Sequence, residues 1–443
     1  MSVSRNMGSD GVTAFVPSSF AVKKMELTRY DGTEPRNIQN LVTDFEIIES
    51  IFSPTLVAKF SIKDTVNLME EFPIIGHERF HLVLERKEGT LGREKRIELK
   101  FIITEYPLYG RSPNNPNVHA YKFSAISEHS YLSTLTRISR KFGKDKTIDE
   151  IKNIFSKDLK FSGEFVEGGE IISKSKGVLP NMQPLRAIEF FRVRACDLEQ
   201  SPLMVYQTID GKIHLKTLHN LFQQEIYGEY EYHIFFQTTP GTDQDYEERS
   251  RRILSCASDL KFGRVFQSQR GAFASNLDYV DLSTKSYGEK IYSYSIKHNS
   301  KKGEYKPFSQ KFVVDNKSLD SHSNAFSSKV SLNTKAYGES EKNSNQTRFL
   351  YEQKMRSYME SLETMQHDLR LYGDYELNPG KLIKLHFARA IDPQAMEDNS
   401  NEEIGNDELL SGNYLVTAVN HSFKGGEYFC NVRVKKNNLG FEI

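Results

Sequence analysis

One short motif in this 443-residue chain has the spacing of a metal-dependent active site. His77-Glu78-Arg79-Phe80-His81 matches the H-E-x-x-H pattern, in which two histidines hold zinc and the glutamate acts as a general base. That chemistry needs a helix, because a helix brings residues four apart to within about 6 Å on one face. The sequence instead runs into Leu82-Val83-Leu84, which is typical of a strand, where the two histidines would stand about 13 Å apart. We therefore predict a strand without a metal site, and retain a zinc metallopeptidase using His77, Glu78 and His81 as the alternative.

No other motif in the sequence predicts an enzyme. The chain contains no G-x-x-x-x-G-K-[ST] or G-x-G-x-x-G phosphate loop and no G-x-S-x-G nucleophile elbow. Its three cysteines, Cys196, Cys256 and Cys430, are far apart and odd in number, so they predict neither a disulfide framework nor a metal knuckle. Cys196 is expected to be a packed thiol on a helix. We predict no catalytic residue, no cofactor and no metal.

Composition narrows the class of protein further. Lys plus Arg and Asp plus Glu both number 59, so the formal net charge is zero, which argues against a surface built to neutralise nucleic-acid phosphates. Hydrophobic residues at 38% and aromatic residues at 12% suffice for packed cores in two to four domains. The N-terminal sequence lacks the apolar core of a signal peptide, and no run approaches the length of a membrane span. We expect a soluble chain made in a cytoplasm.

The elements that would position any site are mostly strands. Residues 21–126 contain six stretches of alternating apolar, β-branched and aromatic residues separated by turn signals, which favours a small antiparallel barrel or sandwich. From Tyr131 the pattern becomes α+β. Thr147 and Glu150 have capping-box spacing, and a second helix is expected after Pro184, with apolar spacing that continues to Leu198. A hairpin is predicted around Asp210-Gly211.

The second half of the chain changes character twice. Residues 300–346 are rich in serine and asparagine, which predicts a long loop or partly ordered insertion. Helical periodicity returns between Arg348 and Met365, where a row of methionines is read as packing. The C-terminal residues are again strand-like, with turns predicted at Asn378-Pro379-Gly380 and at Gly425-Gly426.

Two of these C-terminal stretches carry a family resemblance. Leu371–Ile383 resembles the "G-n-f-x-L-x-P-G-x-x-I" strand–turn–strand of the contractile-tail central hub family, and Ser411–His421, Gly425-Gly426 and Tyr428–Val434 resemble its closing hairpin. That family includes the baseplate hub of T-four-like bacteriophages and the hub part of type VI secretion spike proteins. The stretches Ile47–Pro54, Ala58–Asp64 and Ile75–Leu82, and the helix after Pro184, agree with it in order along the chain. Residues 300–346 have no counterpart in the family.

The resemblance implies a mainly β fold with α+β parts, in which two tail-tube-like antiparallel β-barrel domains are accompanied by smaller helical and inserted segments. We divide the chain into a flexible tail (1–19), a first barrel (20–130 with a return segment at about 246–295), a second α+β tube-like domain (131–245, completed by about 366–443) and an inserted segment (296–365). Asn378, Pro379, Gly380, Gly425 and Gly426 are expected to form structural turns of the closing barrel.

The resemblance also implies a function. Three chains would form a pseudo-sixfold ring that adapts the sixfold tail tube protein to the threefold central spike protein, beside other baseplate proteins, with DNA only passing through the lumen during ejection. The chain would then be a structural protein of the virion, made in the host cytoplasm, and not an enzyme. A phage and a pyocin-like or secretion injector are not distinguished by the sequence. Besides the zinc peptidase, an OB-like module that binds nucleic acid or glycan remains open.

Overall fold

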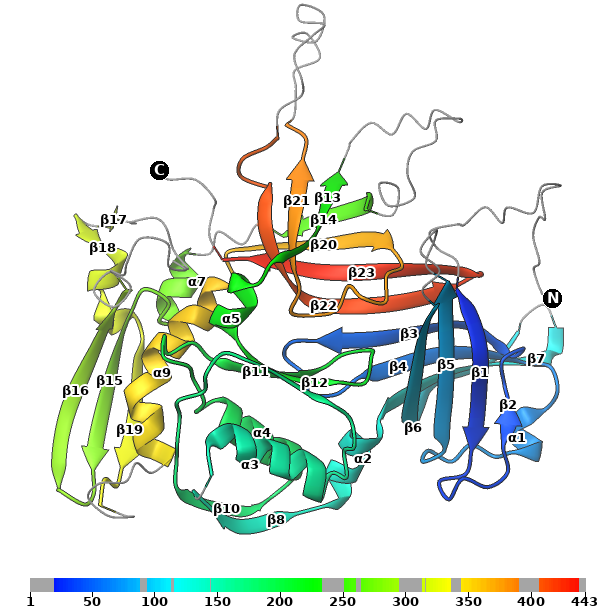
Figure 1. Ribbon diagram of the computed structural model, residues 1–443, viewed down its shortest axis with the longest axis horizontal. Helices are drawn as coiled ribbons and strands as arrows, with labels where there is room; N and C mark the ends of the chain where they lie inside the picture. Colours follow the sequence, from blue (N-terminus) through cyan, green and yellow to red (C-terminus); the bar gives the residue numbers. More distant parts are fainter. Residues whose placement is uncertain are drawn as a thin grey trace, which may run out of the picture.

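The computed structural model shows a mainly β chain with a smaller helical content (Figure 1). It describes residues 20–87, 94–112, 115–143, 145–232, 251–259, 264–294, 313–314, 316–335, 344–389 and 406–437. The predicted tail at 1–19 lies outside these residues, as does much of the Ser/Asn-rich stretch. No described helix has the length and apolar content needed to cross a membrane.

The first β block is formed by the N-terminal strands, as their alternating pattern predicted. In β4, Ala58, Phe60 and Ile62 are buried while Lys59 and Lys63 are exposed, because successive side chains of a strand point to opposite faces. The block consists of β1 (Ala21–Thr28), β2 (Arg36–Asn37), β3 (Val42–Ser50), β4 (Val57–Asp64), β5 (Arg79–Lys87), β6 (Glu94–Ser112) and β7 (Asn115–Ser127), with the short α1 (Leu68–Glu71) between β4 and β5.

The C-terminal β block gathers strands from two distant parts of the sequence. Its members are β13 (Ile226–Tyr232), β14 (Ile253–Asp259), β20 (Met365–Tyr372), β21 (Leu382–Phe387), β22 (Gly412–Lys424) and β23 (Glu427–Lys436). Most of its pairs are antiparallel, whereas β13 pairs with β21 in parallel. Buried side chains of both blocks belong to one hydrophobic cluster.

An α+β region lies between the blocks in sequence and has its own core. It contains α2 (Glu128–Leu135), β8 (Ile138–Phe142), α3 (Thr147–Asn153), the π-helix η1 (Ile154–Asp158), β9 (Phe165–Gly168), β10 (Gly177–Met182), α4 (Pro184–Arg192), β11 (Leu203–Gln207), β12 (Ile213–Thr217) and α5 (Leu218–Gln223). The hairpin predicted around Asp210-Gly211 is confirmed by the antiparallel pairing of β11 with β12.

Two local predictions in this region were wrong. The capping box does not form, because Thr147 is already helical and its hydroxyl donates to the Ser173 carbonyl. The helix after Pro184 ends at Arg192, and Leu198, which kept the helical spacing, is 70% exposed. Cys196 is buried as predicted, but it lies beyond that helix, in a β-bridge with Pro202.

The inserted region forms a small separate sheet packed beside a long helix. It contains α7 (Arg264–Gln269), β15 (Ala274–Asp281), β16 (Ser286–Ser293), β17 (Val313–Val314), β18 (Lys317–Ser318), the 3₁₀ turns η2 (Leu319–Ser321) and η3 (Ser323–Ala325), β19 (Ser327–Leu332) and α9 (Ser344–Ser361). Helix α9 agrees with the helix predicted from Arg348, although Met365 already belongs to β20. The strands β17–β19 were not predicted, because their stretch is rich in serine.

The return segment predicted at 246–295 does not join the first β block within the described residues. Its first strand, β14, pairs with β20 of the C-terminal block. Its later strands pair elsewhere, since β15 lies between β16 and β19 in the inserted sheet. This return segment was expected from the family resemblance, and the composition of a strand does not specify which edge it joins.

A single strand pair joins the two blocks. On one edge of β22 the first residues pair with β21 and the later residues, from Ala418 to Lys424, pair antiparallel with β3, while β23 occupies its other edge. The result is one hydrogen-bonded sheet of 13 strands that runs from β14 through β22 and β3 to β2 (Figure 1). Among the described residues this is an open path rather than a closed ring, so the two barrels remain a prediction. We call the β3–β22 junction the seam.

Stacked aromatic rings cross the seam on its buried side. Phe45 of β3 lies against Phe423 of β22, with ring centroids 4.3 Å apart. Phe423 stacks in turn on Tyr428 of β23 at 4.3 Å, and Tyr428 on Tyr375 at 4.8 Å. Aromatic pairs of this kind contribute about 0.5–1.5 kcal/mol each beyond the area they bury. The seam is therefore a packed core and not only a row of backbone hydrogen bonds.

A fully buried ion pair lies beside these rings. His421 Nε2 of β22 is 2.9 Å from Glu49 Oε1 of β3, and both side chains have no exposed surface. The second carboxylate oxygen of Glu49 accepts a hydrogen bond of 2.7 Å from the backbone N–H of Ile209, in the turn between β11 and β12. The other imidazole nitrogen of His421 is 2.7 Å from the Tyr428 hydroxyl. Glu49 thus connects the first block, the C-terminal block and the α+β region.

At neutral and mildly alkaline pH the pair of Glu49 and His421, which we call the seam pair, retains a proton that the unfolded chain releases. Burial raises the pKa of Glu49 against the opposing effect of its hydrogen bond to His421. Burial alone would lower the pKa of His421, but Cys430 and the Glu49 carboxylate outweigh it and raise that pKa to about 10. Both directions favour the protonated pair in the folded chain.

Removal of one partner should strongly destabilise the fold. We expect His421→Leu to lower the free energy of unfolding by about 3–5 kcal/mol, because Glu49 would stay buried without its partner. The matched control is the surface pair of the same residue types, His386 and Glu229, which are 2.7 Å apart with Glu229 53% exposed. His386→Ala should cost no more than about 1 kcal/mol. Urea titration followed by circular dichroism measures both, and equal effects would contradict the role given to the seam pair.

The seam should also make stability depend on pH. Because the folded pair keeps a proton that unfolded histidine loses above pH 6.5, its contribution is present below that pH and falls as the pH rises towards 10. The slope expected for one proton is at most about 1.4 kcal/mol per pH unit. Denaturation of the wild-type chain and of Glu49→Gln/His421→Gln at pH 7, 8 and 9 measures this difference. If the difference in the free energy of unfolding between the two proteins stays constant or grows as the pH rises, the seam pair does not hold this proton.

Candidate functional site

The outer side of the seam sheet forms one continuous polar face. On β20, β23, β22, β3, β4 and β7, residues alternate between the buried core and this exposed side, and the strand registers place the exposed residues opposite one another. This is the expected pattern for an antiparallel sheet with one face in solvent. We call it the polar face, and it crosses from the C-terminal block to the first block without interruption.

Acidic and basic side chains are interspersed over the polar face. The acidic residues at outward positions are Asp44, Glu46, Asp368 and Glu427, with Glu105 and Asp259 on the adjoining β6 and β14, and the basic residues include Lys59, Lys63, Lys122, Arg370, Lys424 and Arg433. Glu46 stands opposite Lys59 in the register, and its carboxylate also accepts from Asn420. The face is polar and mixes both signs of charge, which is unsuited to tight binding of a polyanion.

A shallow hollow of about 360 Å³ lies in this face over β20, β23 and β22. Its polar lining consists of Ser255, Asp368, Arg370, Asn420, Asn431 and Arg433. Arg433 donates two hydrogen bonds to Asp368, at 2.8 and 3.1 Å, so this guanidinium is already matched by a carboxylate. The Asp368 hydrogen bond accordingly raises the pKa of Arg433.

Arg370 is held differently in the same hollow. Its guanidinium lies 4.2 Å from the centre of the Phe429 ring. Among the described residues no carboxylate forms an ion pair with it. A guanidinium stacked on a ring keeps its N–H groups available at the ring's edge.

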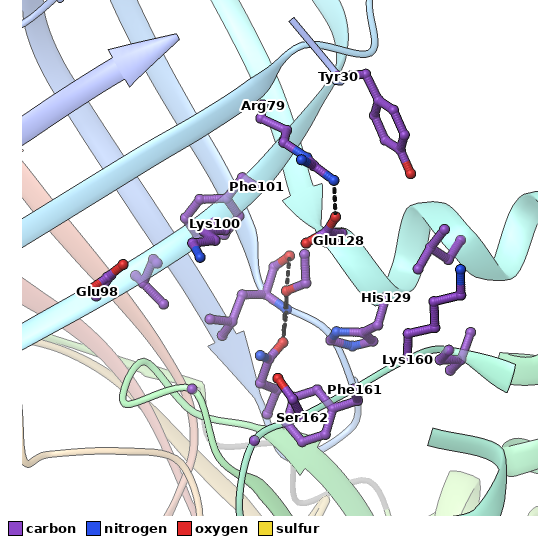
Figure 2. Close-up of a pocket in the computed structure, with 18 residues that line it drawn as sticks. Tyr30, Arg79, Glu98, Lys100, Phe101, Glu128, His129, Lys160, Phe161 and Ser162 are labelled. Atoms are coloured by element: carbon purple, nitrogen blue, oxygen red, sulfur yellow. Dashed lines mark hydrogen bonds and ion pairs between the residues drawn. The ribbon is translucent and has the colours of Figure 1, made fainter. Parts of the chain in front are cut away.

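A larger cavity, of about 500 Å³, lies where the first block meets the α+β region (Figure 2). Its charged side chains are largely engaged, since Arg79 donates to Glu128 at 2.9 Å and also covers the Tyr30 ring. Ser127 donates to the Gln207 side chain at 2.7 Å, and His129 lies 2.9 Å from the Pro54 carbonyl oxygen. Burial lowers the pKa of His129, so its neutral ring donates to that carbonyl. These contacts join two regions of the chain and provide no nucleophile with an adjacent base.

The H-E-x-x-H residues do not form the arrangement that zinc chemistry needs. His77 and Glu78 lie in the loop before β5, and His81 lies within that strand, as its sequence predicted. Glu78 is buried and accepts hydrogen bonds from the backbone N–H groups of Ile75 and Gly76, while His81 lies 2.9 Å from Glu98. Within the described part of the chain, no group of three or more His, Cys, Asp or Glu residues is placed to hold a metal ion.

The three cysteines are separate thiols. Cys196 and Cys430 are buried, and Cys256 is partly buried on β14. Burial raises the pKa of Cys256, which disfavours the reactive thiolate.

The predicted turn residues occupy two different environments. Gly425 and Gly426 form the tight turn between β22 and β23, both with positive φ and with open space around them. Asn378, Pro379 and Gly380 precede β21, and Gly380, at φ +85°, packs against the α+β region: a side chain there would come within 2.1 Å of the Tyr206 hydroxyl. Gln224 donates to the Gly380 carbonyl, and the Gly380 N–H donates to Val416 at 2.7 Å. This second turn is therefore a contact between regions as well as a chain reversal.

Sequence reasoning missed the residues that matter most to this arrangement. Glu49 is the one acidic position within the buried row of β3, and His421 falls in a stretch chosen only for its family pattern. The sequence did contain one signal for Glu49, namely a charged residue at a position where the alternating pattern of the strand predicts a buried side chain. The polar face also follows from alternation, but its continuity depends on the pairing of β3 with β22, which no local pattern specifies.

Comparison with known proteins places this architecture in a class of folds. No protein-family model matches the chain, and no curated protein matches it. The tail protein of Neisseria meningitidis MC58 superposes with a TM-score of 0.52 and 11% identity, over 94% of this chain and 97% of that one. The 43 kDa tail protein of prophage MuSo2 from Shewanella oneidensis superposes with a TM-score of 0.51 and 10% identity, over 94% and 98%.

The chain thus has the fold of phage tail proteins. At these identities the likeness concerns the fold, and it confirms at that level the resemblance to the tail hub family that the C-terminal motifs indicated. A component of the type VI secretion system of Escherichia coli superposes with a TM-score of 0.44 and 8% identity, over 94% of this chain and 76% of that one.

The contact at Gly380 yields a prediction with a matched control. Gly380→Ala should destabilise the chain by about 1–2 kcal/mol from backbone strain and by about 1–3 kcal/mol more from the clash with Tyr206. Gly425→Ala, also at positive φ but in open space, should show the strain alone. Adding Tyr206→Phe to Gly380→Ala should recover part of the loss. Thermal unfolding measures the series, and equal costs at the two glycines would refute the contact.

Proposed function

We propose that this protein is a structural baseplate hub, three copies of which form a ring with pseudo-sixfold symmetry. The observation that carries the proposal is the seam sheet, in which two β blocks of one chain follow each other with a single shared polar face. The similarity of the fold to phage tail proteins supports it. Two blocks per chain and three chains would supply six similar units around one axis.

The ends of the seam sheet are suited to closing such a ring. The strands of the polar face and their two neighbours follow one another in the order β14, β20, β23, β22 in the C-terminal block and then β3, β4, β7, β6 in the first block. Within the described residues β14 pairs on one side only, and β5 covers β6 only up to Ile102, so that the later part of β6 pairs with β7 alone. The open edges of β14 and of the later part of β6 therefore offer backbone groups that a neighbouring copy can pair with, which would remove exposed edges from the assembly.

In this ring the polar face would line the lumen. A lumen through which DNA passes should be hydrated but should not retain the DNA, and the interspersed charges of the polar face meet both conditions. One rim of the ring would then meet the sixfold tail tube and the other the threefold central spike, beside other baseplate proteins. The protein would act without catalysis, as a part of the virion tail or of a related contractile injector, and would be made in the host cytoplasm.

The oligomeric mass is the first test. Light scattering at several concentrations should give a particle of about three times 51.0 kDa, and negative-stain images should show a threefold ring. If the chain is monomeric alone, addition of the candidate spike protein should produce the trimer. A monomer that stays so with the spike, or that binds single-stranded nucleic acid in a salt-dependent way, would refute the hub and favour a binding module.

A further inference from the structure

The hollow on the polar face gathers guanidinium and amide side chains in one depression. It brings two guanidinium groups, of Arg370 and Arg433, and two amide side chains, of Asn420 and Asn431, around one depression. The only carboxylate among its lining residues is that of Asp368. The hollow therefore has one more positive than negative charge, together with neutral side chains that can donate hydrogen bonds.

These donors suit the oxygens of a phosphate group. Guanidinium groups present paired N–H donors whose spacing fits two oxygens of one phosphate. Arg370 is fixed over the Phe429 ring, so binding would immobilise little additional side-chain freedom. Asn431 lies directly opposite Arg370 in the β20–β23 register and adds an amide beside it.

Asp368 limits how strongly such a group can be held. Its carboxylate engages the Arg433 guanidinium at two points, so only Arg370 is left without an acidic partner among the described lining residues. Asp368 and Arg433 are both about half exposed, at 47% and 51%, so a phosphate could reach the pair without unfolding the sheet. The carboxylate and an incoming phosphate would compete for the same donors.

We propose that the hollow between β20, β23 and β22 is a weak contact site for the backbone phosphates of double-stranded DNA, and that Asp368 keeps it weak. The ligand class is a nucleic-acid phosphodiester, and the inference rests on the proposed function because DNA reaches this face in a hub. Each chain contributes one such site. DNA would then be guided along the lumen by contacts that form and break as it moves.

The decisive variant is Asp368→Asn, which frees Arg433 while nearly keeping the side-chain volume. Binding of a short DNA duplex is followed by fluorescence anisotropy at several salt concentrations, with the wild-type protein as reference. Affinity for DNA should rise about tenfold at low salt, since a charge-assisted hydrogen bond is gained. The dependence of log K on log salt should steepen by about 0.9 for each phosphate contact added.

Two further variants make the result specific to the hollow. Glu427→Gln makes the same charge change on the same face but outside the hollow, and should leave DNA affinity close to that of the wild type. Asp368→Asn/Arg433→Gln should lose the gain made by Asp368→Asn. Equal gains for Asp368→Asn and Glu427→Gln would overturn the site, and so would no gain in either.

Free phosphate is separated from DNA by a calorimetric titration of Asp368→Asn with inorganic phosphate. Heat of binding to inorganic phosphate without any gain in duplex affinity would overturn the nucleic-acid assignment. The mass of each variant is measured in parallel. A trimer that gains no DNA affinity refutes the site alone, whereas a protein that gains affinity but stays monomeric even with the spike protein supports the site and refutes the ring.

Discussion

The fold depends on one buried charge interaction across the seam. The carboxylate of Glu49 is enclosed between two β blocks and the β11–β12 turn, and it is tolerated there because His421 and the Ile209 N–H satisfy it. A buried pair of this kind adds little net stability compared with an apolar pair, but it strongly penalises any arrangement that leaves one partner alone. A shift of β22 by one residue along β3 would turn His421 to the solvent side and leave Glu49 unpaired. The pair therefore fixes the register at which the two blocks join.

That register determines where the polar face is. Since side chains alternate along a strand, the same pairing that points His421 and Phe423 inward points Asn420 outward, beside Glu46 of β3. Every polar position from β20 to β7 follows from this alignment. The turn at Gly380 also stabilises this arrangement, because its backbone packs closely on Tyr206 of the α+β region. The position of the proposed lumen surface therefore follows from the register that the buried core imposes on β22 and β3.

The amino-acid sequence predicts the local elements well and their partners poorly. Alternation in residues such as Ala58, Lys59 and Phe60 reports which side of a strand is buried, so the strands of the first block could be predicted. Helical spacing after Pro184 continued past the real helix end, because Leu198 keeps the spacing by chance while its side chain is exposed. The partner of β14 could not be predicted, since strand pairing is decided by tertiary contacts. For the same reason the hollow that contains Arg370 has no signature in the sequence.

The seam has a further consequence for synthesis of the chain. Glu49 and His421 are 372 positions apart, so a ribosome making about 5–20 residues per second needs roughly 20–70 s to deliver the second after the first. During that interval β3 has an open edge and an unpaired inward-facing acid. A nascent or truncated chain lacking β22 would present this edge to other chains, with the aggregation risk that exposed strand edges carry. The open edge of β3 is covered only when the chain is complete and β22 pairs with it, and not when the first half of the chain folds.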